Sequence, residues 1–403
     1  MPTLAAPRQT TSHGLISLWR MPVAQRLEPF GQTIFTTITR LAAEHGAVDL
    51  GQGYPNFDGP GFVKAAATAA IERGEGQYAR SFGITPLVEA IAERFSTDTG
   101  LSIDPLANVT VTSGCTEALA ATFLGLLEPG DEVVLIEPTY DAYRPDAALA
   151  GAVPRFVTLE PPDFSLDADV LRAAFSHKTR AVVVNTPHNP TGRVFTRDEL
   201  ETVASLCHEY DAIAITDEVY ERMVFDGEHV SIATLEGMWE RTVTLSSLGK
   251  SFSLTGWKIG WAIAPESLTA GVRAAHQFLT FATATPLQHG AVAALKAPAA
   301  YYEELETAYT RRRDLLAAGL DDIGFRVFMP EGTYFMLADH TTFGFPDDVA
   351  FVEHLITSTG VAAIPPSAFY HRGDHGASLV RFAFCKDEAT LEAELERKSK
   401  LRA

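Results

Sequence analysis

Positive charge, paired cysteines and long apolar runs are all scarce in this sequence. The chain carries 32 Lys and Arg against 51 Asp and Glu, a formal net charge of −19, so we expect neither nucleic acid nor an anionic membrane surface as a partner. Its three cysteines, Cys115, Cys207 and Cys385, form no CxxC pair and no Cys/His ligand spacing. This pattern favours a reducing compartment and argues against structural zinc.

Segments that would direct the chain to or across a membrane are not evident. No stretch reaches the length of about 18 apolar residues that a membrane helix needs. The N-terminus, MPTLAAPRQTTSHG, lacks the apolar segment of a signal peptide. We therefore expect a cytoplasmic protein, and the 403 residues are too many for one hydrophobic core, so two or three domains are expected.

Strand and helix patterns alternate in the middle of the chain. Apolar runs such as VVLIE, AVVVN and AIAIT are separated by segments with helical periodicity. Strands that are apolar throughout are typical of a mostly parallel sheet covered by helices on both faces. The predicted fold is α/β, with this large domain in residues 61–299. An N-terminal arm and part of a smaller α+β domain are expected in 1–60, and the rest of the small domain in 300–403.

The stretch TVTLSSLGKSFSLTGWKIGW, residues 242–261, places one lysine in a loop of small residues. TVTL is an apolar, β-branched run that predicts a buried strand, and Lys250 follows it. Desolvation and a nearby cation would lower the pKa of Lys250 and free its amine to attack a carbonyl. The alternative is an ordinary solvated lysine in a loop.

Two other strand ends carry polar groups suited to a phosphorylated, nitrogen-containing ligand. Residues 112–116, TSGCT, lie between a strand and a helix N-terminus, where exposed N–H groups would hold a phosphate, although an ordinary helix cap is the alternative. Asp217 ends the run AIAIT, where a protonated pyridine nitrogen would balance its charge, although a capping or turn aspartate fits as well. Tyr220 follows and could contact a cofactor hydroxyl, or it could be a core tyrosine.

Four further side chains are candidates for the same site. The prolines around Asn189 would aim its amide, and Tyr140 could stack on an aromatic ring. Lys258 would add a cation near the phosphate loop, or would be a surface charge. Arg381 interrupts the apolar strand LVRFAFC, so its guanidinium needs an anion, either a substrate carboxylate or a structural salt bridge.

Together these segments resemble the class I and II aminotransferases, which have the aspartate aminotransferase fold (fold type I) and use pyridoxal 5'-phosphate. SSLGKSFSLTGWKIGW resembles the family's pyridoxal-lysine signature, and NTPHNPTG and DEVYERMVF resemble two other landmark loops. Asn189, Asp217, Tyr220 and Lys250 occur in the family's order and at similar separations. LGQGYPNFDGP and TGWK are similar to segments of the kynurenine/glutamine aminotransferases and the bacterial methionine aminotransferases. Many relatives have Arg where Lys258 stands.

The resemblance implies roles for matching positions. Lys250 would form a Schiff base with the cofactor and move a proton, Asp217 would keep the pyridine nitrogen protonated, and Arg381 would bind the substrate α-carboxylate. The resemblance also implies that Tyr220 and Asn189 contact the phenolic oxygen of the cofactor and that Tyr140 stacks on its ring. The cofactor phosphate would be held by Gly114, Cys115, Thr116, Ser247 and Lys258, together with Tyr78 from a second subunit. Gly53 and Phe35 would line the substrate pocket.

The resemblance therefore predicts a homodimeric transaminase with shared active sites, whose partners are small molecules, an amino acid and a 2-oxo acid. A carbon–sulfur β-lyase on the same fold is the first alternative, since fold does not decide between the two outcomes. A non-catalytic sensor fused to a DNA-binding domain is the second. Residues 276–286, HQFLTFATATP, occupy the place of the arginine that dicarboxylate-specific relatives supply from the neighbouring subunit. They offer Phe278 and Phe281 but no Arg or Lys, although His276 could be cationic, so we expect amino acids with thioether, amide or aromatic side chains.

Overall fold

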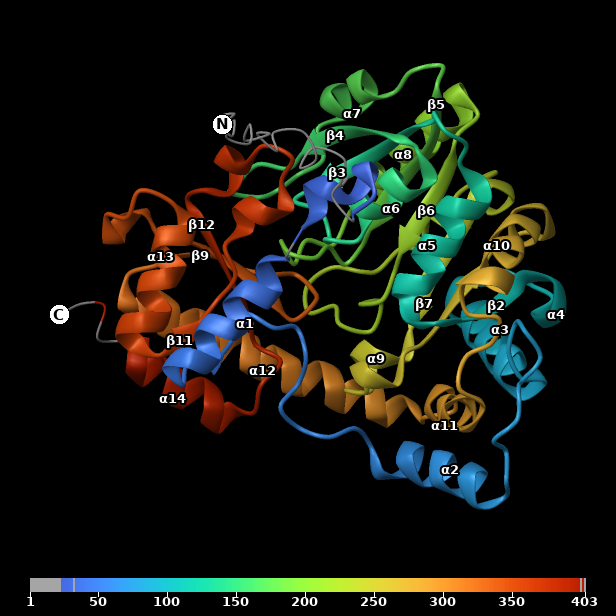
Figure 1. The fold of residues 1–403 in the computed structure, drawn as a ribbon, viewed down its shortest axis with the longest axis horizontal. Helices are drawn as coiled ribbons and strands as arrows, with labels where there is room; N and C mark the ends of the chain where they lie inside the picture. The colour runs from blue at the N-terminus through green and yellow to red at the C-terminus, as the bar shows by residue number, and fades with distance from the viewer. Residues whose placement is uncertain (1–22, 32, 399–400, 402–403) are drawn as a thin grey trace, which may run out of the picture.

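The computed structural model describes residues 23–31, 33–398 and 401. Its larger part is built on a seven-stranded sheet in the order β2-β8-β7-β6-β5-β3-β4 (Figure 1). Every strand of this sheet is parallel to the others except β8. The strands are β2 (Val109–Ser113), β3 (Glu132–Glu137), β4 (Val153–Thr158), β5 (Thr179–Asn185), β6 (Ile213–Asp217), β7 (Thr242–Ser247) and β8 (Ile259–Ile263). The expected α/β fold with a mostly parallel sheet is thus confirmed, whereas the expected arm over residues 1 to about 20 lies largely outside the described residues.

Helices cover both faces of this sheet because its central strands are apolar on both sides. Val134 and Val182 pack into one core with α7 (Ala168–Ala174) and α8 (Arg197–Tyr210). Their neighbours Val133 and Val183 point to the opposite core, with α5 (Gly114–Leu126), α6 (Tyr143–Ala150) and α10 (Glu266–Leu279). Alternate side chains of a strand point to opposite faces of the sheet, so a strand that is apolar throughout contributes side chains to the cores on both faces.

Strand β8 was not expected from the sequence. It lies between β2 and β7, antiparallel to both, and is formed by IGWAI directly after Lys258. The chain leaves β7, forms the short α9 (Leu248–Ser251), and turns back at Lys258, whose φ of 53° is left-handed. This hairpin places Lys250 and Lys258 at the same end of the sheet.

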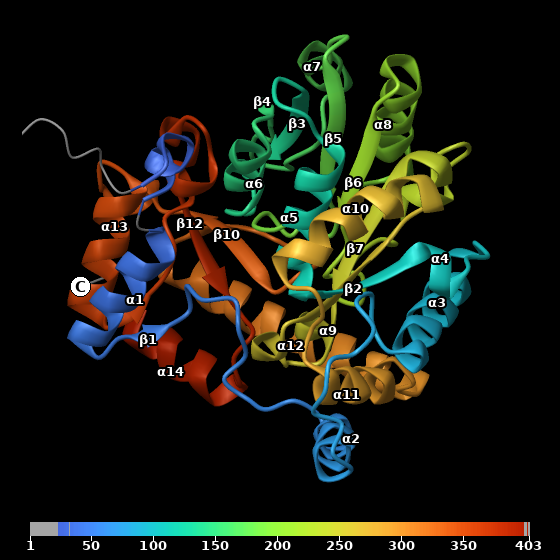
Figure 2. The same cartoon turned by 45° about the vertical axis from the view of Figure 1, so that its right-hand side comes forward.

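The smaller part contains a three-stranded antiparallel sheet in the order β12-β10-β9 and a two-stranded sheet of β1 and β11. The segment FRVFMPEGTYFML contributes two strands, β9 (Arg326–Phe328) and β10 (Phe335–Asp339), which pair with each other, and β10 also pairs with β12 (Leu379–Ala383). β1 (Val48–Asp49) pairs in parallel with β11 (Val361–Ala362), so the N-terminal segment joins the C-terminal part (Figure 2). The helices of this part are α1 (Ile34–His45), α12 (Ala299–Ile323), α13 (Asp348–His354) and α14 (Glu388–Lys398).

These contacts divide the chain into a larger and a smaller part, which we propose as two domains. We propose that the described residues up to Pro60 and those from residue 300 form the small domain, with residues 61–299 as the large one.

Helices α2 (Gly61–Glu72), α3 (Thr85–Thr99) and α11 (Thr285–Leu295) bury a separate core against β2 and β8. Within the described residues, no helix combines the length and apolarity needed to cross a membrane.

Helices α5 and α10 cross at a pair of glycines, and this contact generates a prediction. A Cβ atom on Gly125 would lie 2.2 Å from the carbonyl oxygen of Gly271. Gly125→Ala should therefore push the helices apart and lower the free energy of unfolding by about 1–3 kcal/mol, measured by urea denaturation. Gly61→Ala is the control, because a Cβ there meets no atom within 4 Å, and wild-type stability in Gly125→Ala would contradict the close crossing.

Candidate active site

A cavity of about 300 Å³ opens where the strands of the large sheet end. Its walls come from the N-terminal part of α5, from the ends of β5, β6 and β7, from α9, and from β10 and β12 of the small part. Parallel strands bring their carboxyl ends to one edge of the sheet, so residues far apart in sequence meet there. The residues singled out from the sequence that line it are Phe35, Gly53, Gly114, Cys115, Thr116, Tyr140, Asn189, Asp217, Tyr220, Ser247, Lys250, Lys258 and Arg381.

Asp217 is the last residue of β6 and is only 4% exposed. Its carboxylate accepts hydrogen bonds from the Tyr143 hydroxyl at 2.8 Å and, more weakly, from the Cys115 thiol at 3.6 Å. Burial raises the pKa of Asp217, while the Tyr143 hydrogen bond and the nearby Lys250 work in the opposite direction. A buried carboxylate held in this way favours a cationic partner in the cavity.

Lys250 lies in α9, one turn after β7. Its Nζ donates to the Tyr334 hydroxyl at 3.0 Å, and that hydroxyl donates to the Gly53 carbonyl oxygen at 2.6 Å. Burial lowers the pKa of Lys250, because the ammonium form loses water, although Cys385 and Asp217 partly offset the shift. The amine is therefore easier to deprotonate than that of a solvated lysine, as a nucleophile requires.

Arg381, in β12, is 2% exposed. Its guanidinium lies 4.1 Å from the ring centroid of Phe335 and donates to Asn189 Oδ1 at 3.2 Å and to the Gly51 carbonyl oxygen at 2.8 Å. No carboxylate of the described residues forms an ion pair with it, and its Nε lacks a hydrogen-bond partner among them. The structural salt bridge considered above is thus not made, and the guanidinium can accept an anionic ligand.

The N-terminus of α5 meets the β7–β8 hairpin at another wall of the cavity. Lys258 Nζ donates to Thr116 Oγ1 at 3.3 Å. Gly114 has a left-handed φ of 75°, and a Cβ there would lie 3.0 Å from Lys258 Nζ. Backbone N–H groups at a helix N-terminus, a hydroxyl and an ammonium form a site suited to a phosphate.

Several residues that line the cavity or contact its polar groups were not singled out from the sequence. Tyr143 donates a hydrogen bond to Asp217 and lies three residues after Tyr140, in EPTYDAY. Its position close to an expected site residue could therefore have indicated it as a candidate. Tyr334 holds Lys250 but lies 84 residues away, and no local pattern marks it. Asp141 and Phe335 complete the wall around Arg381.

Tyr78 does not line this cavity within the chain. Its side chain is 85% exposed and packs edge-on against Phe281, with ring centroids 5.3 Å apart. Phe278 nearby is 90% exposed. His276, in contrast, is fully buried and bonded to Glu117 and to the Ser81 carbonyl oxygen, so it does not face a ligand in this cavity.

Known proteins are similar to this chain over almost its whole length. A family model described as aminotransferase class I and II matches residues 46–397. N-succinyldiaminopimelate aminotransferase from Mycobacterium tuberculosis has 46% identity and a TM-score of 0.92, covering 94% of this chain and 100% of that one. Human kynurenine–oxoglutarate transaminase 1 is 40% identical over 92% of this chain and 96% of its own length. YbdL from Escherichia coli, with a methionine aminotransferase function, is 37% identical with a TM-score of 0.91, covering 94% of this chain and 100% of that one.

The hydrogen bond to Asp217 generates a prediction. Tyr143→Phe removes the closest donor to a buried carboxylate and should lower the free energy of unfolding by about 1–3 kcal/mol, measured by chemical denaturation at neutral pH. Tyr370→Phe is a matched control, because its buried hydroxyl has no hydrogen-bond partner among the described residues. Equal effects of the two substitutions would show that the Tyr143 hydroxyl does not stabilise Asp217.

Proposed function

This chain belongs to the class I and II aminotransferases, and we propose that it uses pyridoxal 5'-phosphate to transfer amino groups from amino acids with neutral side chains to 2-oxo acids. The relatives at 37–46% identity are all aminotransferases, which supports the reaction class over the sensor considered from the sequence. The identity of the amino-acid donor is the more specific part of what we propose.

The cavity fits the cofactor in two respects. Asp217 offers a buried carboxylate for the ring nitrogen, and the wall at Gly114, Thr116 and Lys258 offers donors for the phosphate. When bound, the cofactor supplies a protonated ring that accepts the electron pair left on the substrate carbon. We propose that Tyr140 stacks on that ring, that Asn189 and Tyr220 contact its oxygen, and that Cys115 and Ser247 complete the phosphate wall.

Lys250 would bind the cofactor and move the proton of the reaction. Its lowered pKa leaves more of the amine in the neutral form that can accept a proton. The Tyr334 hydroxyl orients Nζ toward the interior through its own bond to Gly53. We assign Tyr334 as a positioning residue for this lysine.

The unpaired Nε of Arg381 is the observation that carries the proposal for the substrate. Amino acids and 2-oxo acids share an α-carboxylate, and a planar guanidinium binds that group with two parallel hydrogen bonds. Burial lowers the pKa of Arg381 to about 10, so it remains charged at neutral pH. We propose that Gly53 and Phe35 flank the bound substrate, since both line the same cavity.

Neutral donors are proposed because the cavity offers no further cation. Among the described residues that line it, the only cations are Lys250, Lys258 and Arg381, and each has a role above. A side-chain carboxylate buried there would cost on the order of several kcal/mol, whereas an apolar side chain would gain about 1.5–3 kcal/mol. N-succinyldiaminopimelate is a second candidate donor, because a relative at 46% identity is named for it.

We propose that two chains form a homodimer in which Tyr78 reaches the neighbour's phosphate wall. The support is that Tyr78, Phe278 and Phe281 are exposed aromatic side chains on neighbouring segments. Exposed aromatic surface of this kind is typical of an interface with another protein.

The lysine and the shared site can be tested together. Lys250→Ala should fold, lose the visible absorbance of the lysine-bound cofactor and transaminate no donor, while Tyr78→Ala should bind cofactor weakly. Unfolding and refolding the two variants together should regenerate one intact site in each mixed dimer, and about a quarter of wild-type activity for random pairing. Steady-state turnover with a 2-oxo acid is the measurement.

Each part of that experiment has its own contrary outcome. Lys296→Ala, at an exposed position, is the control for removing a lysine and should be fully active. Turnover by Lys250→Ala alone would remove the lysine from the mechanism. Inactive mixtures of two separately impaired variants would leave the lysine in place and contradict the shared site.

Donor preference is tested by comparing kcat/KM across amino acids with one 2-oxo acid. Methionine, glutamine, phenylalanine or kynurenine should exceed aspartate by about tenfold or more, because an unpaired buried carboxylate is costly. N-succinyldiaminopimelate belongs in the same panel. The highest kcat/KM with aspartate would refute the neutral pocket, and release of pyruvate or ammonia without oxo-acid consumption would favour the lyase.

A further inference from the structure

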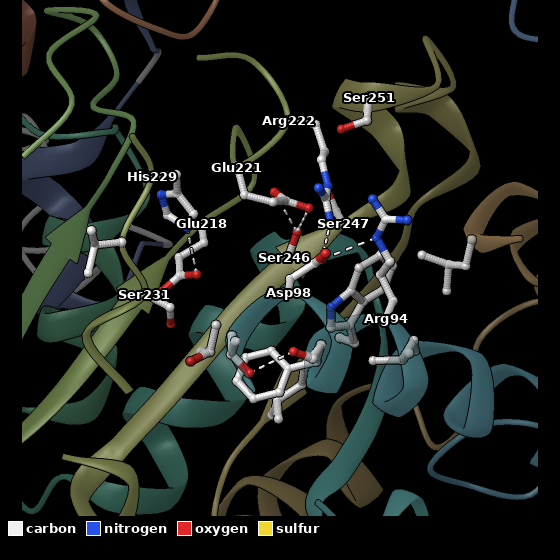
Figure 3. A pocket seen from close by; sticks show the side chains of 18 of the residues that line it. Arg94, Asp98, Glu218, Glu221, Arg222, His229, Ser231, Ser246, Ser247 and Ser251 are labelled. Carbon is white, nitrogen blue, oxygen red and sulfur yellow. Dashed lines mark hydrogen bonds and ion pairs between the residues drawn. The ribbon is translucent and has the colours of Figure 1, made fainter. Parts of the chain in front are cut away.

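A second cavity, of about 430 Å³, lies behind the segments that carry Lys250 and Asp217. Its walls include Ser246 and Ser251 on either side of Lys250, and Glu218 and Glu221 after β6 (Figure 3). Ser247 is the only described residue that lines both cavities. The two cavities are therefore separated by β7 and α9.

Two carboxylates in this cavity, the exposed Glu228 and the partly buried Glu221, form no ion pair within the described residues. Asp98 is paired with Arg94 and Arg222, and Glu218 is paired with His229. The Glu221 carboxylate accepts only from the Ser246 hydroxyl, at 3.1 and 3.2 Å to its two oxygens, and forms no ion pair within the described residues. Figure 3 shows Glu221 and Ser246 facing each other across the cavity wall.

Two buried hydroxyls on the same walls also lack partners. Thr244 and Ser251 are each 3% exposed and line the cavity. Neither Thr244 Oγ1 nor Ser251 Oγ has a hydrogen-bond partner among the described residues, and the same is true of His229 Nδ1. A buried polar atom left without a partner destabilises the fold, so a ligand that engages these atoms would relieve that cost.

The remaining walls combine charged side chains, including Arg94, Arg197 and Arg222, with apolar and aromatic ones. Phe95, Phe252, Trp261 and Tyr302 contribute rings, and Ile91 and Leu295 contribute aliphatic side chains. Burial raises the pKa of Glu221 to about 7, against the opposing effects of Arg222 and His229 and with some help from Glu218. A cation beside Glu221 would favour its charged form.

We propose that this second cavity binds a small organic cation, with a planar amidinium or guanidinium head on Glu221 and an apolar body against the aromatic walls. The two oxygens of a carboxylate match two parallel N–H donors of such a head. A ring face such as that of Trp261 also attracts cations and packs against apolar groups, whereas the Tyr302 ring already contacts the guanidinium groups of Arg94 and Arg222. The serine and threonine hydroxyls supply further acceptors for the head.

Such a ligand differs from the substrates of the first cavity. It needs no carboxylate for Arg381, and an amidinium does not form a Schiff base with a carbonyl group. It would contact the residues on both sides of Lys250 without competing for the amino-acid site. The proposal therefore does not depend on which amino acid the enzyme uses.

The test uses benzamidine and its neutral analogue benzamide on the full-length enzyme purified with pyridoxal 5'-phosphate. Isothermal titration calorimetry should show one benzamidine per chain, with benzamide at least about tenfold weaker, because only the amidinium makes charge-assisted hydrogen bonds. Equal affinity for the two compounds, or no heat with benzamidine at millimolar concentration, would overturn the proposal.

Two matched substitutions test whether the ligand binds at Glu221. Glu221→Gln should weaken benzamidine about tenfold or more while leaving benzamide unchanged. Glu228→Gln, which lines the same cavity but is exposed, should keep the affinity within about twofold. Undiminished binding in Glu221→Gln would overturn the assignment, and if that variant does not fold, the comparison of the two compounds on the wild-type enzyme decides alone.

Discussion

The buried guanidinium of Arg381 ties together three parts of the chain that are far apart in sequence. It projects from β12 of the small part, contacts Asn189 beyond β5 of the large sheet, and binds the carbonyl of Gly51 beside β1. A charge this deeply buried is tolerated only when its donors are satisfied. Two of its groups are satisfied by the protein, so the same side chain that joins the parts also lies where we propose that the substrate carboxylate binds.

Tyr334 repeats this arrangement at the other side of the cavity. From the segment before β10 it contacts Lys250 in α9 and the backbone of Gly53. Arg381 is thus connected to the N-terminal segment by one hydrogen bond, and Lys250 by two in series through Tyr334. Movement of the small part would change both contacts together, which couples the geometry of the proposed proton carrier to that of the carboxylate site.

Strand β7 separates two chemically different spaces. On one side Asp217 and Lys250 lie in a cavity whose unpaired donor, Arg381, suits an anionic ligand. On the other side Glu221 lacks a cation, and the unpaired hydroxyls of Thr244 and Ser251 suit a donor-rich head group. Both spaces exist because α9 turns sharply after β7 and the chain returns as β8.

The sequence by itself determined the parallel sheet, the order of the loops at its edge and most of the residues around the first cavity. Apolar runs predict strands, and a residue placed just after such a run is placed at the sheet edge. It did not reveal β8, the partners Tyr143 and Tyr334, or the second cavity. Those depend on which distant segments meet and on which buried polar atoms remain unpaired. The spacing of residues along the chain indicates neither which distant segments meet nor which polar atoms stay unpaired. Lys250 and Tyr334, for example, are 84 residues apart. Their hydrogen bond forms only when the tertiary structure brings both groups out of water together.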